Sequence, residues 1–166
     1  ITIGKISDQA MINRSTFYRY FSDKYILRDT IVADIVKDFA DHMEVDFLHM
    51  DIKNKDHTKT LEYSLSHLCT KKRELELLWN QPTLGRNVFD EMIDAGASKV
   101  ENEIKNHKTI TPEKKALADW YAKLLVNNYL VTVRWWFAHS DTVSASQITE
   151  MMERHMISGT VSTLLS

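Results

Sequence analysis

The sequence predicts an all-α protein, on three observations. Only 4 Gly and 2 Pro occur among 166 residues, whereas β-sandwiches and barrels need many turn residues. Apolar residues recur at spacings of three and four, which is the repeat of a helix buried along one side. Residues that cap helix N-termini precede most of these runs. We therefore expect about eight helices.

The first part of the chain predicts two short helices followed by a long one. The first begins after Thr2, and the second spans 14–20. Apolar residues keep helical spacing through 24–47, which predicts one long third helix. Candidate N-caps of the three helices are Thr2, Asn13, and Ser22 or Asp23. We expect these elements to form one region, 1–47.

The remainder, 48–166, predicts a second region that is a helical body. Helices are expected near 61–79, over 84–106 after a cap at Thr83, over 112–139 after a cap at Thr111, and onward from a capping box of Ser144 and Gln147. Pro112 follows Thr111 at the first helical position, where Pro is favoured.

Composition excludes several classes of protein. Hydrophobic residues make up 43% and charged residues 27% of the chain, a balance typical of globular rather than disordered proteins. The single cysteine, Cys69, permits no internal disulfide and no cysteine-based zinc finger. The most apolar stretch, 116–138, carries Asp119, Lys123 and Arg134, each of which would cost about 2–3 kcal/mol in a bilayer. We expect a cytoplasmic protein with no membrane partner.

Two short helices joined by a three-residue turn and followed by a long helix describe a helix-turn-helix. Phe17 and Phe21 lie four residues apart, so they anchor the second helix and leave its other faces polar. Hydroxyl and guanidinium groups there match the donors and acceptors of base edges. Tyr18 and Tyr20 offer hydroxyls to phosphates, and Lys24 lies at a helix N-terminus, where anions bind.

Charge is distributed unevenly along the chain. Residues 1–28 carry five basic and two acidic side chains, a net charge of +3, so the other 138 residues carry −5 of the total of −2. This asymmetry directs the N-terminal end towards nucleic acid. The simpler alternative is that the aromatic residues form an ordinary core, but that alternative does not account for the basic end.

The stretch ITIGKISDQAMINRSTFYRYFSDKYIL, with Thr16-Phe17-Tyr18, Phe21 and Lys24 at its centre, resembles the helix-turn-helix of TetR-type transcriptional regulators. The resemblance implies a homodimeric regulator, with repression the expected outcome, that binds a palindromic operator in double-stranded DNA. It also implies release or modulation by a small-molecule effector of unknown identity. The positions at which such proteins touch DNA are occupied by Thr2, Lys5, Arg14, Ser15, Thr16, Tyr18, Tyr20 and Lys24.

Two features depart from the family pattern. Met11 stands in the turn where the family usually has Gly, so either a positive φ at this position is strained or the turn is built differently. The family's first helix normally covers the face formed by Ile3, Ile6 and Phe17, and we expect it upstream of Ile1.

The 112–139 helix is apolar over most of its circumference. We therefore expect one apolar partner inside the subunit and one in a second copy, with the last helix completing half of a four-helix bundle. A purely intramolecular core is the alternative. The predicted dimer interface consists of Trp135, Trp136, Ile148, Met152, Met156 and Gly159.

Aromatic and Met side chains of the helical body indicate an apolar effector pocket with one polar group, although plain core is the alternative. The predicted pocket residues are Trp79, Phe89, Met92, Trp120, Tyr121, Asn128 and Tyr129. Residues 133–136, Ser144 and Gln147 also resemble the subgroup typified by the dihydroxyacetone kinase operon activator. Some of its members work through a protein partner, so the alternative function is a protein-interaction module or co-activator on this scaffold.

One stripe of the long third helix carries side chains able to ligate a divalent ion, namely Asp38, His42, Asp46 and His49. Such a stripe is usually a solvated face, so we predict no metal site. His67 and Cys69 are two residues apart on a helix and do not share a face, which favours a core position for the thiol.

Catalytic motifs are missing from the sequence. It contains no Gly-rich phosphate loop, no G-x-S-x-G and no H-E-x-x-H. We therefore predict no catalytic residues, no cofactor and no enzymatic activity.

Overall fold

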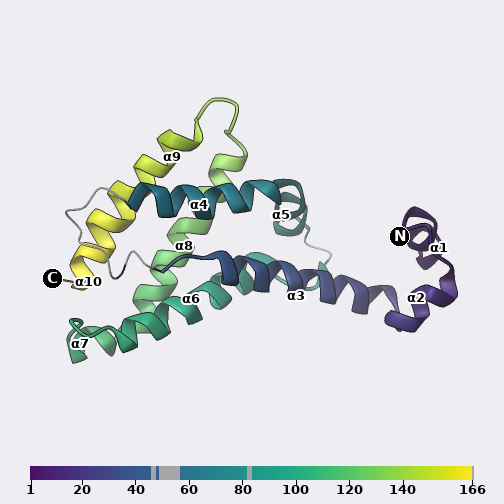
Figure 1. The fold of residues 1–166 in the computed structure, drawn as a ribbon, viewed down its shortest axis with the longest axis horizontal. Helices are drawn as coiled ribbons and strands as arrows, with labels where there is room; N and C mark the ends of the chain where they lie inside the picture. The colour runs from purple at the N-terminus through teal and green to yellow at the C-terminus, as the bar shows by residue number, and fades with distance from the viewer. Residues whose placement is uncertain (46–47, 49–56, 82–83, 166) are drawn as a thin grey trace. The chain divides into compact units, whose positions relative to one another are not determined.

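A computed structural model of the chain describes residues 1–45, 48, 57–81 and 84–165. Within these residues every regular element is a helix, which confirms the predicted all-α class (Figure 1). None of the helices in the described ranges combines the length and the apolar character needed to span a bilayer. The chain divides into two compact units, Ile1–Asp38 and Phe39–Ser166.

The first unit contains two short helices and most of a long one. These are α1 (Ile3–Gln9), α2 (Arg14–Tyr20) and α3 (Lys24–His42). The bounds of α2 are those that the sequence predicted. Asn13 takes the N-cap position of α2 but makes no side-chain capping hydrogen bond.

Two of the predicted N-caps in this unit are confirmed. Thr2 Oγ1 accepts a hydrogen bond from the backbone N–H of Lys5 at 3.3 Å. Asp23 Oδ1 accepts from the N–H groups of Tyr25 and Ile26 at 2.7 and 2.9 Å. These bonds satisfy donors that the first turn of a helix leaves without a partner, so they define where α1 and α3 begin.

The turn between α1 and α2 contains a backbone strain. Met11 has a φ of 54° and its side chain is 91% exposed. A left-handed conformation costs an L-residue roughly 1–2 kcal/mol, and no packing of the Met side chain offsets that cost. Of the two alternatives that the sequence left open for this turn, the structure has the positive φ.

Replacing Met11 by Gly is therefore expected to stabilise the first unit by about 0.5–1 kcal/mol, because Gly adopts a positive φ without steric cost. Amide hydrogen exchange of α1 and α2 should slow about two- to fivefold. Met11→Ala retains the strain and serves as the control, with exchange unchanged. Faster exchange in Met11→Gly would show that the turn is not strained.

The second unit is built around α8. Its elements are α4 (His57–Thr70), α5 (Lys72–Trp79), α6 (Val88–Asn106), α7 (Pro112–Lys115), α8 (Ala118–Phe137), α9 (Ala145–Met152), a π-helix η3 (Glu153–Val161) and α10 (Ser162–Leu165). α6 packs along α8, and α5, α9 and η3 also contact α8 (Figure 1). Leu125, Leu130 and Val133 of α8 are buried, so this helix carries much of the core.

Two capping signals of the second unit are confirmed. Thr111 Oγ1 accepts from Lys114 N–H at 3.5 Å, with Pro112 at the start of α7. Ser144 and Gln147 form both bonds of the capping box, at 2.9 and 3.2 Å. Local spacing was sufficient to predict them because each bond joins residues three positions apart.

Other helix boundaries differ from the prediction. The helix expected from 84 begins at Val88, after an N-cap at Asn87, and the predicted cap Thr83 lies outside the described residues. The helix expected over 112–139 is divided into α7 and α8. Leu117 N–H donates to the carbonyl of Lys114, three residues back rather than four, which tightens the chain between the two helices.

The long helix α3 ends at His42 instead of near 47, and the compact units divide at Asp38. The physical reason is a cap from α6 that acts on the last turn of α3. Lys99 Nζ donates to the carbonyls of Ala40, Asp41 and Met43 at 3.1, 3.3 and 2.6 Å. A cation at these terminal carbonyls stabilises the end of the helix.

α6 and α8 approach each other closely at Gly96. A Cβ atom at this position would lie 2.9 Å from Val126 Cγ1 and 3.0 Å from Met43 Sδ. Such distances are too short for packed carbon and sulfur atoms. The absence of a side chain at Gly96 therefore allows α6, α8 and the segment after α3 to meet.

Candidate nucleic-acid interface

The residues predicted to contact DNA all lie at the surface of the first unit. Exposed residues are Thr2, Lys5, Arg14, Ser15, Tyr18 and Tyr20, and half-buried residues are Thr16 and Lys24. Phe17 is only 2% exposed, and its ring centroid lies 5.7 Å from that of Phe21. α2 is thus anchored by one buried aromatic side chain and presents polar groups on its outer faces.

A surface groove of about 390 Å³ brings four of these residues together. The groove is lined by the N-cap residue of α1, two residues of α2 and the first residue of α3, namely Thr2, Arg14, Tyr18 and Lys24. A second groove of about 710 Å³ is lined by Lys5 along α1. Ser15, Thr16 and Tyr20 do not line either groove.

Cationic side chains are concentrated where α3 begins. Lys24 Nζ donates to the Ile1 carbonyl at 3.0 Å and lies 5.1 Å from the Tyr25 ring centroid. The Arg28 guanidinium lies 5.4 Å from the same ring. Sequence reasoning missed Tyr25, which is exposed and also lines the 390 Å³ groove. The sequence signal that could have found Tyr25 is its position between Lys24 and Arg28, two basic residues one helical turn apart.

Arg14 lies directly over the backbone of α1. A Cβ at Gly4 would lie 2.6 Å from Arg14 Nη2. Gly4 therefore allows the Arg14 side chain to pack against α1 while the residue remains exposed overall. This contact positions one guanidinium at the N-terminus of α2, where a reader of base edges or phosphates is useful.

Three residues predicted for the effector pocket pack together in the second unit. Trp79 Nε1 donates to Met92 Sδ at 3.3 Å, and the Trp79 and Phe89 ring centroids are 5.4 Å apart. The Arg134 guanidinium lies 5.0 Å from the Phe89 ring centroid. The group is an aromatic cluster with a cation on its outer side.

The other predicted pocket residues lie elsewhere along α8. Trp120 and Tyr121 are in contact near its start, with ring centroids 4.9 Å apart. Trp120 and Arg134 are separated by about 21 Å along the axis, at a rise of about 1.5 Å per residue. Asn128 is half-buried, and its backbone carbonyl accepts a hydrogen bond from Thr132 Oγ1 at 2.7 Å. Tyr129 lines a narrow crevice near α4.

Of the six residues predicted for the dimer interface, four are buried inside the chain and two are exposed at its surface. Trp136, Ile148, Met152 and Met156 are buried within the chain itself, whereas Trp135 and Gly159 are exposed. Ile148, Met152 and Met156 follow one another at intervals of four residues and so share one face. Since α9 packs on α4 and α8, this face is buried in the chain's own core. Trp135 is exposed on α8 and stacks on His139, with ring centroids 4.2 Å apart.

Cys69 is exposed, which contradicts the expected core position. The buried face of α4 carries Leu61, Leu65 and Leu68, and Cys69 lies about 100° around the helix from Leu68. Partial desolvation raises the pKa of its thiol, an effect that Lys72 opposes. Of the predicted metal stripe, Asp46 and His49 lie outside the described residues, while Asp38 and His42 are half-buried.

The chain matches no protein-family model, no curated protein and no solved structure. Its function is therefore inferred from the chemistry and placement of its own residues. The most informative placement is the polar surface of α1, α2 and the start of α3.

Proposed function

We propose that the chain is a TetR-like transcriptional regulator, and specifically a cytoplasmic repressor that binds a palindromic DNA operator as a homodimer. The observation that carries the proposal is the surface of α2, where buried Phe17 is surrounded by exposed residues with hydroxyl and guanidinium groups. The net charge of +3 over residues 1–28 supports the same conclusion, because phosphate attraction dominates DNA affinity. No part of the proposal requires enzymatic chemistry.

α2 acts as the reading helix in this proposal. Its seven residues span about 10 Å, a length that fits the major groove. Arg14, Ser15 and Thr16 in its first turn contact base edges, as is usual for the N-terminal residues of a recognition helix. Tyr18, Tyr20 and Lys24 contact phosphates and hold the helix in register.

Homodimerisation is supported by an exposed apolar stripe on one face of α8. Leu117, Trp120, Val131 and Trp135 are 46–55% exposed, and their spacings of 3, 11 and 4 repeat with the helical turn. Exposed apolar side chains that share one face of a helix favour burial against a second copy. A dimer also supplies two reading helices for half-sites about 34–36 Å apart.

An effector bound in the second unit would regulate the operator complex. α3 continues from the first unit into the second, so a shift of its last turn is the proposed link between effector and DNA. Such coupling is typically about 1–3 kcal/mol and is reciprocal, so operator DNA weakens effector binding equally. Saturating effector that leaves operator affinity unchanged would overturn this part of the proposal.

The proposal is tested by fluorescence anisotropy with labelled duplex DNA from the region upstream of the chain's own gene. We expect affinity to fall steeply with salt, and Lys5→Ala to reduce the slope of log K against log salt by about 1, because one phosphate contact is lost. Lys108→Ala, an exposed lysine of the second unit, is the matched control and should leave the slope unchanged.

Two results would overturn the proposal. Binding that is absent even at low salt would exclude a DNA-binding role, and a protein partner that co-purifies in that case would favour the interaction module. A monomer at micromolar concentration in sedimentation would exclude the homodimer.

A further inference from the structure

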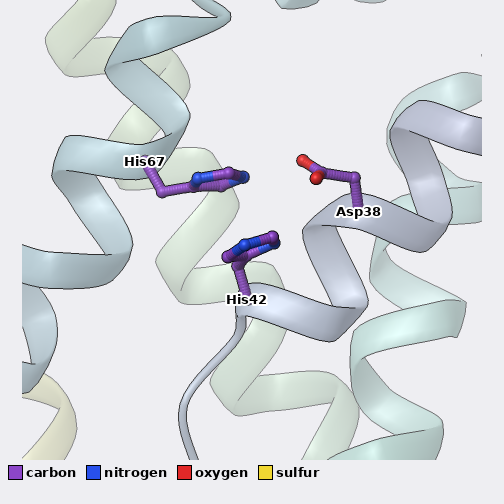
Figure 2. A group of neighbouring side chains, drawn as sticks. All are labelled: Asp38, His42 and His67. Atoms are coloured by element: carbon purple, nitrogen blue, oxygen red, sulfur yellow. The ribbon is translucent and has the colours of Figure 1, made fainter.

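Three side chains that can ligate a metal lie close together beside the end of α3. Asp38 and His42 are one turn apart on this helix, and His67 comes from α4 (Figure 2). Each offers a ligand atom, and these atoms all lie within 4.8 Å of one another. The His42 and His67 rings are stacked, with centroids 3.8 Å apart and planes at 12°. The stacking places one imidazole from each helix face to face.

The position of the cluster is determined by packing around it. Lys99 caps the last turn of α3, which ends at His42. On α4, Leu65 and Leu68 are buried on either side of His67 along the chain. Both histidines are half-buried.

A buried hydroxyl lines the same crevice as the two imidazoles. Tyr129 is 5% exposed and lies with His42 and His67 in the crevice wall. Within the described residues its hydroxyl has no hydrogen-bond partner, and a buried donor in that state costs about 1–3 kcal/mol. The Tyr129 hydroxyl is therefore a donor that the described residues leave unsatisfied.

We propose that Asp38, His42 and His67 form a binding site for a divalent transition-metal ion, with Zn²⁺ the best match. Two imidazoles and one carboxylate are donors that suit zinc, whereas Ca²⁺ and Mg²⁺ take oxygen ligands. Three protein ligands leave a fourth position for water or an exchangeable anion.

The distances are compatible with a single ion. A tetrahedral zinc ion holds its nitrogen ligands about 3.3 Å apart, because each Zn–N bond is about 2.0 Å long. Ligand atoms already within 4.8 Å reach this spacing when the side chains rotate and the stacked rings tilt so that a nitrogen of each points at the ion. The sequence hid the site because His67 follows His42 by 25 residues and lies on a different helix.

The test uses the whole chain, stripped of metal with a chelator, and needs no DNA, so its outcome is independent of the proposed regulator. Titration with Co²⁺ should produce the visible absorption of a tetrahedral site, which Zn²⁺ then displaces at one ion per chain. Zinc should also raise the melting temperature, because it binds the folded state.

Variants distinguish the cluster from other histidines. His42→Ala and His67→Ala should each weaken Zn²⁺ binding by more than about 100-fold, since even outer-shell partners of a metal cost about 10–100-fold. His155→Ala, an exposed histidine of η3, is the matched control and should bind like the parent chain. His67→Gln keeps the size and a hydrogen-bonding group, so it tests the site if the alanine variants fold poorly.

The proposal fails on any of three results. These are an unchanged melting temperature with zinc, a Co²⁺ spectrum that is octahedral or absent, and equal affinities in the His67→Gln variant and the parent chain.

Discussion

Replacing Leu130 by Ala is expected to lower the free energy of unfolding of the second unit by about 2–5 kcal/mol. Leu130 is fully buried in the middle of α8, and α6, α9 and η3 all contact this helix. Removal of the side chain loses its burial and leaves a cavity that the surrounding helices fill only in part. Urea denaturation followed by far-UV circular dichroism measures the loss.

Leu77→Ala is the matched control for this prediction. It makes the same chemical change on α5, but Leu77 is 55% exposed, so we expect a loss of at most about 1 kcal/mol. Similar losses in the two variants would mean that α8 is not at the centre of the core.

Arg14→Ala is expected to weaken operator binding by about 5- to 150-fold, which corresponds to about 1–3 kcal/mol for a side chain that reads base edges. Arg14 is exposed at the first position of α2 and packs over Gly4, so its guanidinium is held in one place. Fluorescence anisotropy with the operator duplex and with a scrambled duplex measures both affinity and specificity.

Arg19→Ala supplies the comparison. Arg19 has the same charge, lies on the same helix and is also exposed, but it is not among the predicted contact residues. Arg19→Ala removes one positive charge that makes no specific contact, so it should reduce the affinity for both duplexes only slightly. Equal effects of the two substitutions would show that α2 attracts DNA by charge alone. Arg14→Lys retains the charge and should still lose specificity, because Lys lacks the bidentate fork.

Local chemistry made part of the fold predictable. The caps at Thr2, Asp23 and Thr111 and the box at Ser144 each satisfy a backbone donor two or three residues away. These bonds depend only on residues that are neighbours in sequence. The strain at Met11 was foreseeable for the same reason, because a turn that usually takes Gly contains a residue with a Cβ.

Predictions that required knowledge of packing were less successful. The end of α3 depends on Lys99, which is 56–59 residues away from the carbonyls it caps. Met152 and Met156 suit an interface or a core equally well as apolar residues, and the packing of α9 and η3 placed them inside. A hydrophobic pattern reports which face of a helix is buried, but not what buries it.

The sequence by itself determined that this protein is helical, where α1, α2, α3, α7 and α9 begin, and that Phe17 turns inward beneath a polar, basic end. Each of these features arises from hydrogen bonds and side-chain spacing within a single helix or turn. Only the tertiary structure decided that His67 meets His42, and that α8 leaves an apolar stripe exposed. Those features arise where helices distant in sequence pack together, and packing geometry is set by the whole set of side chains at once.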